Sequence, residues 1–227
     1  MPKTLVIPDT HEELDKLLAL APYIEQADHV VHLGDWFDSF RPYDDRRVRA
    51  ICEYVCAKAE DPKWTLLVGN HCTSYFFRHP DFRCSGYDIR KQVIIDNDLP
   101  EGVRRKFKLC TRVGKFLLSH AGFTKGNLAI ADNQQEALDA AHAGKFHSIF
   151  NIGSARGGRA ASGGCTWLDW RYEFNSLEQA QIVGHTVDKT VRVRVHEPSG
   201  ALSYCLDSQL EHVMLIHDES EVEIVTL

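Results

Sequence analysis

The stretch VVHLGDWFDSF, residues 30–40, decides the fold. An apolar run typical of a buried strand ends at Gly34, and two carboxylates, Asp35 and Asp38, follow with only two aromatic residues between them. Taken alone, glycine and aspartate indicate a turn that is capped by its own acids. The alternative is that the two acids stand at the end of a buried strand in order to bind a ligand, and the sequence on either side bears on that choice.

The segments around this stretch alternate between strand and helix patterns. Strands are predicted at 4–9, 29–35 and 64–70, and helices at 12–27 and 46–60. Thr10 and Glu13 have capping-box spacing at the start of the first helix. This strand–helix order predicts a parallel sheet.

The second half of the chain changes character. Residues 72–104 indicate an irregular insertion with one short helix at 87–96, and 106–122 indicate two strands joined at Val113 and Gly114. A helix is predicted at 128–143, before a glycine-rich segment at 151–165. Five further strands are predicted at 181–186, 191–195, 201–207, 212–218 and 221–227. The pattern favours a single α/β domain, residues 1–227, with two mixed sheets packed face to face and helices outside.

Composition excludes several classes of protein. The 227 residues are 44% hydrophobic and 26% charged, which suits one globular domain. We find no apolar run long enough to cross a bilayer and no signal-peptide pattern, so we expect no membrane partner and a cytoplasmic location. The net charge of −6 argues against a strong nucleic-acid footprint. Seven cysteines without a CxxC pair indicate reduced, mostly buried thiols.

Five of the predicted strands end in residues that commonly bind metals. The strand ends read PDTH (8–11), GDWFD (34–38), GNH (69–71), SHAG (119–122) and GHT (184–186). Ligands bind at the carboxyl ends of the strands in α/β sheets, so these side chains are expected to meet. Each motif alone has a plainer interpretation: a helix cap, a turn or a structural histidine. Their joint occurrence, each after an apolar strand, favours a metal site.

In these five motifs the sequence resembles the calcineurin-like metallophosphoesterase superfamily, from residue 5 to about residue 207. It is most similar to the phosphoprotein-phosphatase branch, which includes phage and bacterial serine/threonine phosphatases. The resemblance implies an αββα sandwich with a dinuclear metal site at the C-terminal strand ends. The implied ligands of the first ion are Asp9, His11 and Asp35, and those of the second are Asp35, Asn70, His120 and His185. Of two divalent ions, Mn is favoured, with Fe, Zn, Ni and Co as alternatives.

The resemblance also implies a mechanism. A metal-bridging hydroxide would attack phosphorus in line, His71 would act as the general acid, and Asp38 would hold the other ring nitrogen of His71. The expected activity is that of a phosphomonoesterase of protein-phosphatase type, with a phosphoprotein, a nucleotide or a small phosphoester as substrate. A nucleotide or nucleic-acid end phosphoesterase, acting on dinucleoside polyphosphates or 2′,3′-cyclic phosphates, is the alternative. A non-catalytic scaffold is disfavoured, because every ligand position and His71 are filled.

Two departures from the family pattern concern phosphate binding and the surroundings of the metals. Protein phosphatases follow the second aspartate with Arg-Gly, whereas Ser39 and Phe40 follow Asp38 here. Cys72 replaces the usual acid after GNH, which would place an exposed, oxidation-sensitive thiol near the metals. The candidates for the missing phosphate-binding arginine are Arg41, Arg156 and Arg159, with Arg171 further along the chain. Trp167 and Trp170 are predicted to be packing residues rather than a platform for a base.

Overall fold

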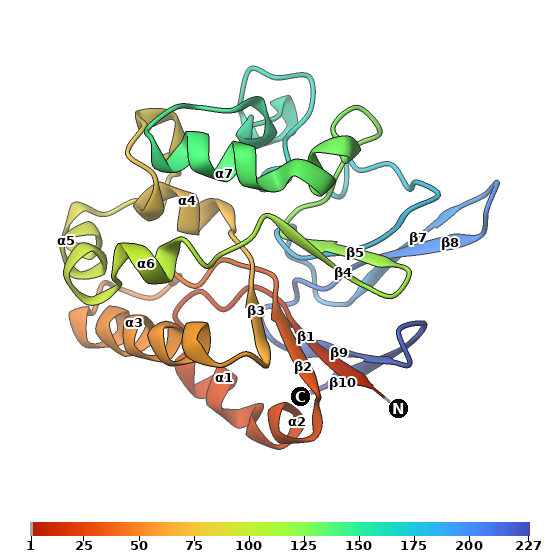
Figure 1. Ribbon diagram of the computed structural model, residues 1–227, viewed down its shortest axis with the longest axis horizontal. Helices are drawn as coiled ribbons and strands as arrows, with labels where there is room; N and C mark the ends of the chain where they lie inside the picture. The colour runs from red at the N-terminus through yellow and green to blue at the C-terminus, as the bar shows by residue number, and fades with distance from the viewer. Residues whose placement is uncertain (1) are drawn as a thin grey trace.

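The structure is a computed structural model that describes residues 2–227, and two five-stranded mixed sheets form its centre (Figure 1). The first sheet has the order β10-β9-β1-β2-β3, and the second has the order β4-β5-β6-β8-β7. The strands of the first sheet are β1 (Lys3–Ile7), β2 (His29–His32), β3 (Trp64–Leu66), β9 (His212–His217) and β10 (Glu221–Thr226). Those of the second are β4 (Cys110–Val113), β5 (Phe116–Ser119), β6 (Ala180–Val183), β7 (Arg192–His196) and β8 (Ala201–Cys205). The predicted αββα sandwich of two mixed sheets is confirmed.

Strand direction brings several strand ends to one edge of the sandwich. The strands β1, β2 and β3 run parallel to one another, and β5, β6 and β8 are also parallel. The pairs β1–β9, β9–β10, β4–β5 and β7–β8 are antiparallel. The segments that follow the parallel strands therefore emerge together, and the predicted ligands lie on them.

Alternating side chains divide the core into layers, as strand geometry requires. In β1, Leu5 and Ile7 pack beneath the helices, whereas Val6 faces the other sheet. In β5, Leu117 points outward, while Phe116 and Leu118 point to the centre. The layer between the sheets is Val6, Val31, Leu33, Leu67, Val113, Phe116, Leu118, Ala180, Ile182, Tyr204, Leu206, Met214 and Ile216. This buried layer joins the sheets, so loops at their edge are held by both.

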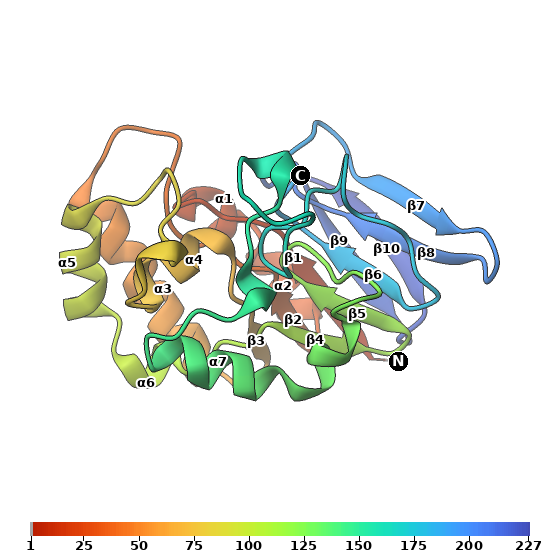
Figure 2. The same ribbon diagram turned by 90° about the horizontal axis from the view of Figure 1, so that it is seen from above.

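Helices cover the outer faces (Figure 1). The helices α1 (Leu14–Ala19), α2 (Ala21–Gln26) and α3 (Asp45–Glu60) lie on the first sheet, and α7 (Gln134–His142) lies near β4 and β5. The loop around Trp170 and Phe174 packs over the remainder of the second sheet, where its aromatic rings contact Val183 and Cys205. Seen from above, the β7–β8 hairpin extends away from the helical end (Figure 2). No helix within residues 2–227 is long and apolar enough to span a membrane.

Two sequence-based predictions about helices are wrong. The segment 12–27 forms two short helices because Pro22 lies in the first turn of α2 and cannot donate an amide to a continuous helix. Thr10 does not cap α1: its hydroxyl lies 2.5 Å from Nε2 of His32, and Glu13 is the N-cap residue without a side-chain bond. The hydroxyl of Thr10 therefore contacts the buried ring of His32 instead of an amide at the start of α1.

The insertion at 72–104 is mostly helical rather than irregular. It contains α4 (Asn70–Phe76), the 3₁₀ turn η1 (Pro80–Phe82), α5 (Ile89–Asp98) and α6 (Glu101–Arg104). Asp88 caps α5 by accepting a hydrogen bond from the amide of Arg90, and α5 packs against α3. Three further 3₁₀ segments, η2 (Leu128–Asn133), η3 (Ser148–Phe150) and η4 (Ser154–Arg156), flank α7.

Candidate metal centre

The structure brings the five predicted motifs together at the carboxyl ends of five strands. Asp9 and His11 follow β1, Asp35 follows β2, and Asn70 opens α4 after β3. From the second sheet, His120 follows β5 directly and His185 follows β6. These six side chains are buried, apart from the half-buried His11, and they lie where the edges of the two sheets meet.

Backbone carbonyls orient two of the histidines. Nδ1 of His11 donates to the carbonyl oxygen of Phe37 at 3.0 Å, and Nδ1 of His120 lies 3.1 Å from the carbonyl oxygen of Leu33. Both Nε2 atoms therefore point toward the other candidate ligands, which is the usual outer-shell arrangement of metal-binding histidines. They lie 4.0 and 3.3 Å from the same oxygen, Oδ2 of Asp35. Asp35 is thus placed between two groups of donors, as a bridging ligand requires.

The second group contains a donor atom without a partner. Oδ1 of Asn70 lies 2.9 Å from Nε2 of His120. Nε2 of His185 is buried and has no hydrogen-bond partner among residues 2–227. One ring nitrogen of His185 lies within 4.8 Å of donor atoms of Asp35 and His120. A buried nitrogen without a partner is costly. A cation at this position would satisfy it, so the donor set fits a divalent metal ion.

Buried carboxylates crowd the first group. The amide of His185 donates to both oxygens of Asp9, at 3.1 and 3.2 Å. Burial and the nearby charge of Asp207 nevertheless raise the pKa of Asp9 well above its ordinary value. Burial would also raise the pKa of Asp35, but the charges of His120 and His71 hold it well below that value. Because oxygen ligands and imidazoles without thiolate surround this position, the chemistry also fits a divalent cation.

Asp207 is a carboxylate that the sequence analysis missed. It is 4% exposed and follows β8, the next parallel strand of the second sheet. Burial raises its pKa, while the amide of Gln209 and the charge of His11 oppose that rise. The segment ALSYCLD, an apolar strand followed by an acid, carries the same signal as the other motifs and could have identified Asp207.

The backbone around the site is held in conformations that non-glycine residues rarely adopt. Positive φ angles occur at His11 (47°), Glu12 (64°), Asp35 (52°), Asp38 (67°) and His185 (66°). Each costs about 1–3 kcal/mol, so the surrounding structure must enforce them. Gly69 shows the same crowding, because a Cβ atom there would collide with the carboxylate of Asp35. The site is therefore strained and tightly packed.

His71 and Asp38 form a pair beside the metal ligands. Nδ1 of His71 lies 2.8 Å from Oδ2 of Asp38, and its ring centroid is 5.1 Å from that of His11. Burial would lower the pKa of His71, but Asp35 and the hydrogen bond to Asp38 raise it well above its ordinary value. Donor atoms of His71, His11 and Asp35 also lie within 4.8 Å of one another. Geometry alone therefore leaves His71 as either a proton donor or a ligand.

A buried network holds Asp38, and the sequence analysis missed it. The ammonium nitrogen of Lys91 donates to Oδ1 of Asp38 at 3.0 Å and to Oε1 of Glu12 at 2.7 Å. The hydroxyl of Tyr75 donates to the same oxygen of Asp38 at 2.5 Å. Glu12 in turn accepts from the amide of Asp38 at 2.9 Å and from Nε of Arg47 at 3.1 Å. No local pattern marks Lys91, because its partners lie 53 and 79 residues away in the sequence.

The candidate arginines occupy different positions. Nε of Arg156 pairs with Asp169 at 2.8 Å, and its Nη2 donates to Thr186 at 3.0 Å. Arg156 lies close enough to contribute to lowering the pKa of His185, after burial and His120. Arg41 pairs with Glu13 at 2.5 Å on the surface. Arg159 is exposed.

Two further predictions concern cysteine and tryptophan. Cys72 is fully buried, so the prediction of an exposed thiol beside the metals at this position is wrong. Its side chain points into the core from the first turn of α4, where burial raises its pKa. Trp170 is a packing residue, as predicted, and stacks on Phe174 at 4.2 Å between centroids. Trp167 is half-buried, with its ring centroid 5.6 Å from that of His185.

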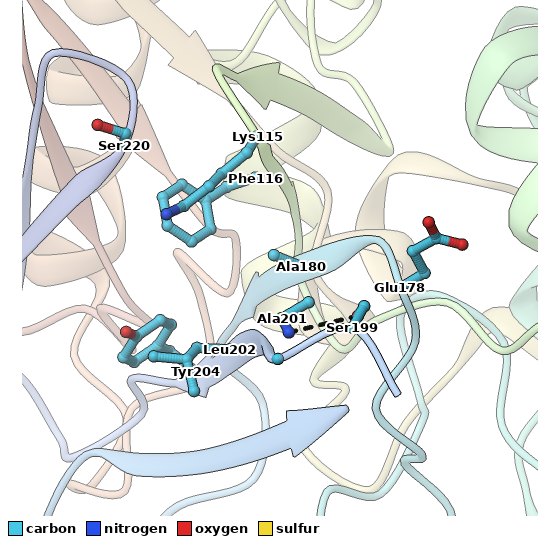
Figure 3. A pocket seen from close by; sticks show the side chains of 10 residues that line it. Lys115, Phe116, Glu178, Ala180, Ser199, Ala201, Leu202, Tyr204 and Ser220 are labelled. Atoms are coloured by element: carbon cyan, nitrogen blue, oxygen red, sulfur yellow. Dashed lines mark hydrogen bonds between the residues drawn. The ribbon is translucent and has the colours of Figure 1, made fainter. Parts of the chain in front are cut away.

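Two cavities differ in their relation to this site. A cavity of about 260 Å³ opens beside Asp9 and His11 and is walled by Phe40 and Arg41. Another, of about 430 Å³, lies at the opposite strand ends and is lined by Phe116, Ala180 and Ala201, the first residues of β5, β6 and β8 (Figure 3). No histidine lines the second cavity. Of these two cavities, the first is therefore the one that contacts candidate metal ligands, namely Asp9 and His11.

Comparison with known proteins agrees with this geometry. The family model of calcineurin-like phosphoesterases matches residues 2–189. The chain is similar to the cold-active protein-tyrosine phosphatase of the psychrophile Shewanella sp., with a TM-score of 0.66 and 18% identity over 100% of this chain and 81% of that one. It is also similar to a protein serine/threonine phosphatase from Saccharomyces cerevisiae, with a TM-score of 0.54 and 15% identity over 99% and 79%. At these identities the likeness concerns the fold. No curated protein sequence matches the chain.

Proposed function

The chain belongs to the calcineurin-like phosphoesterase family and is a metal-dependent phosphoester hydrolase, and from this premise we propose that it is a phosphomonoesterase with a dinuclear centre. Asp9, His11 and Asp35 would hold one divalent ion, and Asp35, Asn70, His120 and His185 the other. Oxygen and imidazole donors without thiolate suit Mn, Fe, Zn, Ni or Co, and among these we favour Mn because it is readily available and common in the family that the chain resembles. We also propose that residues 1–227 act as one domain.

A single observation carries the proposal. His71 is paired with Asp38, and its ring centroid lies 5.1 Å from that of His11, a predicted metal ligand. Nδ1 of His71 is occupied by Asp38, so Nε2 is the nitrogen that remains for a substrate. Asp38 cannot turn away, because Lys91 and Tyr75 occupy its other oxygen. A proton donor fixed in this way serves a reaction whose leaving group is a poor one, such as an alkoxide.

The proposed role of each catalytic group follows from these positions. Two divalent ions, when bound, supply a nucleophile at neutral pH and charge stabilisation for an in-line displacement at phosphorus. His71 then donates the proton on Nε2 to the leaving oxygen, and Asp38 stabilises the imidazolium before the transfer. Arg156 is the residue that we favour for orienting the phosphate, since its guanidinium lies near His185. Arg41 is second, because it walls the cavity beside His11, and Arg159 is third.

The test is a screen of metals against substrates. The protein is freed of metal, loaded with Mn, Fe, Zn, Ni or Co, and assayed on an aryl phosphate, an aryl phosphodiester, a phosphopeptide, a dinucleoside polyphosphate and a 2′,3′-cyclic nucleotide. We expect Mn to support turnover of the monoester and the phosphopeptide. Turnover of the diester alone would contradict the proposal, and no turnover with any metal would favour the scaffold.

A second candidate function is supported by two aromatic rings at the site. Phe40 is 76% exposed, with its ring centroid 4.9 Å from that of His11, and the ring centroid of Trp167 is 5.6 Å from that of His185. A nucleobase could stack on such rings. The alternative is therefore a phosphoesterase acting on nucleotides or nucleic-acid ends, and a preference for the dinucleoside polyphosphate or cyclic nucleotide in the same screen would favour it.

A further inference from the structure

Cys84 lies against the His71–Asp38 pair and makes a second group of metal-binding side chains. Its Sγ is 3.2 Å from Nδ1 of His71 and 3.8 Å from Oδ2 of Asp38. The two latter atoms are 2.8 Å apart. None of the three residues is among the proposed ligands of the dinuclear centre. The three donors, a thiol, an imidazole and a carboxylate, converge on one point next to that centre.

Hydrogen bonds to α4 fix the position of the loop that carries Cys84. The amide of Cys84 donates to the hydroxyl of Ser74 at 2.9 Å, and the amide of Asp88 donates to the hydroxyl of Tyr75 at 3.2 Å. Both anchors belong to α4, the helix that begins at Asn70 and also carries His71. Within the loop, a Cβ atom at position 86 would lie 2.7 Å from Oδ2 of Asp38, so glycine is needed for this close approach.

The donor set and its spacing suit zinc. Tetrahedral zinc, with about 2.3 Å to sulfur and about 2.0 Å to nitrogen or oxygen, separates its donor atoms by about 3.3–3.6 Å. The three separations here, 2.8, 3.2 and 3.8 Å, need only small side-chain shifts to match. The His71 side chain is 20% exposed and Cys84 is half-buried, so a solvent molecule can complete the coordination. Thiolate favours zinc over Mn or Mg.

We propose that Cys84, His71 and Asp38 form a third metal site, selective for zinc, that switches off the general acid. Binding releases the thiol proton of Cys84 to solvent and replaces the proton on Nδ1 of His71 with the metal. The ring then cannot be an imidazolium, which is the form that gives up a proton from Nε2. This consequence rests on the proposed function, whereas the metal site itself does not.

The first experiment detects the site without an activity assay. The full-length protein is titrated with Co²⁺ past two equivalents, and the near-ultraviolet absorption that cobalt shows when bound by thiolate is recorded. The proposed dinuclear ligands contain no thiolate, so they contribute nothing to this band. We expect the band in the wild-type protein and in Cys56→Ser, and its loss in Cys84→Ser. Cys56 is the matched control because it is also half-buried, but it donates to the carbonyl of Asp98 and is remote from the three donors.

The second experiment measures the consequence. Zn²⁺ is added to Mn²⁺-loaded wild-type, Cys84→Ser and Cys56→Ser protein during hydrolysis of an alkyl phosphate. The zinc concentration for half-inhibition should rise at least tenfold in Cys84→Ser and stay unchanged in Cys56→Ser.

The two measurements separate the possible failures. A cobalt band that persists in Cys84→Ser overturns the site. Equal inhibition of all three proteins by zinc overturns its action on the general acid. If the wild-type protein hydrolyses no phosphoester, the proposed function fails, yet the cobalt spectra still decide whether the third site exists.

Discussion

Lys91 places its ammonium nitrogen 3.0 Å from Oδ1 of Asp38, although 53 residues separate them in the sequence. The side chains of both residues are almost fully buried, at 7% and 3% exposure. Burial would lower the pKa of Lys91, but Asp38 and Glu12 raise it above its ordinary value, so the lysine is charged. A buried cation thus holds Oδ1 of Asp38, while Oδ2 of the same carboxylate lies 2.8 Å from Nδ1 of His71.

Replacement of Lys91 by methionine should show that Lys91 positions Asp38 and does not bind the substrate. Lys91→Met leaves Asp38 held by Tyr75 alone at Oδ1, so we expect kcat on alkyl phosphates to fall about tenfold, a part of the 10²- to 10⁴-fold that a general acid contributes. KM should change little. Because two buried carboxylates lose a cation, the free energy of unfolding should fall by about 3–5 kcal/mol. Lys16→Met, which removes an exposed pair with Glu211, is the control and should cost under about 1 kcal/mol.

If the Lys91→Met variant does not fold, Tyr75→Phe provides a second test of the same network. This change removes one hydroxyl donor to Asp38 and keeps the ring that packs on Phe37. A loss of rate that is the same for alkyl and activated aryl phosphates in both variants would show that the network does not act through the general acid.

The role of His71 is tested by its dependence on the leaving group. His71→Asn should retain bound metal and lower kcat by about 10²- to 10⁴-fold for alkyl phosphates, whose leaving oxygens need a proton. Activated aryl phosphates should lose far less, because their leaving groups are stable anions. Loss of metal from the variant, measured by elemental analysis, would instead assign His71 as a ligand, which its place beside His11 and Asp35 also permits.

The bridging assignment of Asp35 predicts a joint loss. Asp35→Asn should lose activity together with bound metal, since one oxygen of Asp35 faces the Nε2 atoms of both His11 and His120. Metal content per chain and turnover are measured on the same sample. Circular dichroism shows whether the variant folds. Full turnover by a folded variant would rule out Asp35 as the shared ligand.

Removal of metal should destabilise the fold. Asp9, Asp35 and Asp207 are buried together, and without a cation their charges repel one another. We expect a chelator to lower Tm and added Mn²⁺ to restore it, since metal at 100 times its Kd stabilises the native state by about 2.7 kcal/mol. Differential scanning calorimetry with and without chelator makes the measurement. An unchanged Tm would mean that these acids bind no metal under the conditions used.

The proposed phosphate contact predicts an effect on KM. Arg156→Lys keeps a positive charge but loses the fork that pairs with Asp169 and Thr186, so KM for phosphomonoesters should rise about tenfold. Arg112→Lys, which loses a fork that pairs with Asp132 and Gln179 on the surface of β4, is the matched control and should leave KM unchanged. An effect of Arg41→Lys alone would move the contact to the cavity beside His11.

Sequence patterns predicted the strands well and the insertion poorly. The strands β1, β2 and β3 repeat an apolar run followed by polar residues, a signal that depends only on neighbours in the chain. The short helices α4 and α6 carry too few residues for a clear 3.6-residue period, so the segment looked irregular. Pro22 lies at the break between α1 and α2, whereas the apolar spacing alone predicted one continuous helix over 12–27.

The candidate metal ligands could be predicted because each one follows its own strand. Sheet topology then brings strand ends to one edge without further information from the side chains. What lies behind those ligands could not be predicted in the same way. Lys91 and Cys84 reach Asp38 or His71 only through the packing of α5 and the loop before it, and Glu12 reaches the amide of Asp38 from the segment between β1 and α1.

The sequence by itself determined the family, the layered fold and the donors at the strand ends, because these depend on local periodicity and on residues adjacent to strands. Tertiary structure alone decided which groups surround His71 and Asp38, and that Cys84 rather than Cys72 is the thiol next to them. The physical reason is that a hydrogen bond or an ion pair acts over a few ångströms, whatever the separation along the chain. Only the folded backbone sets those distances.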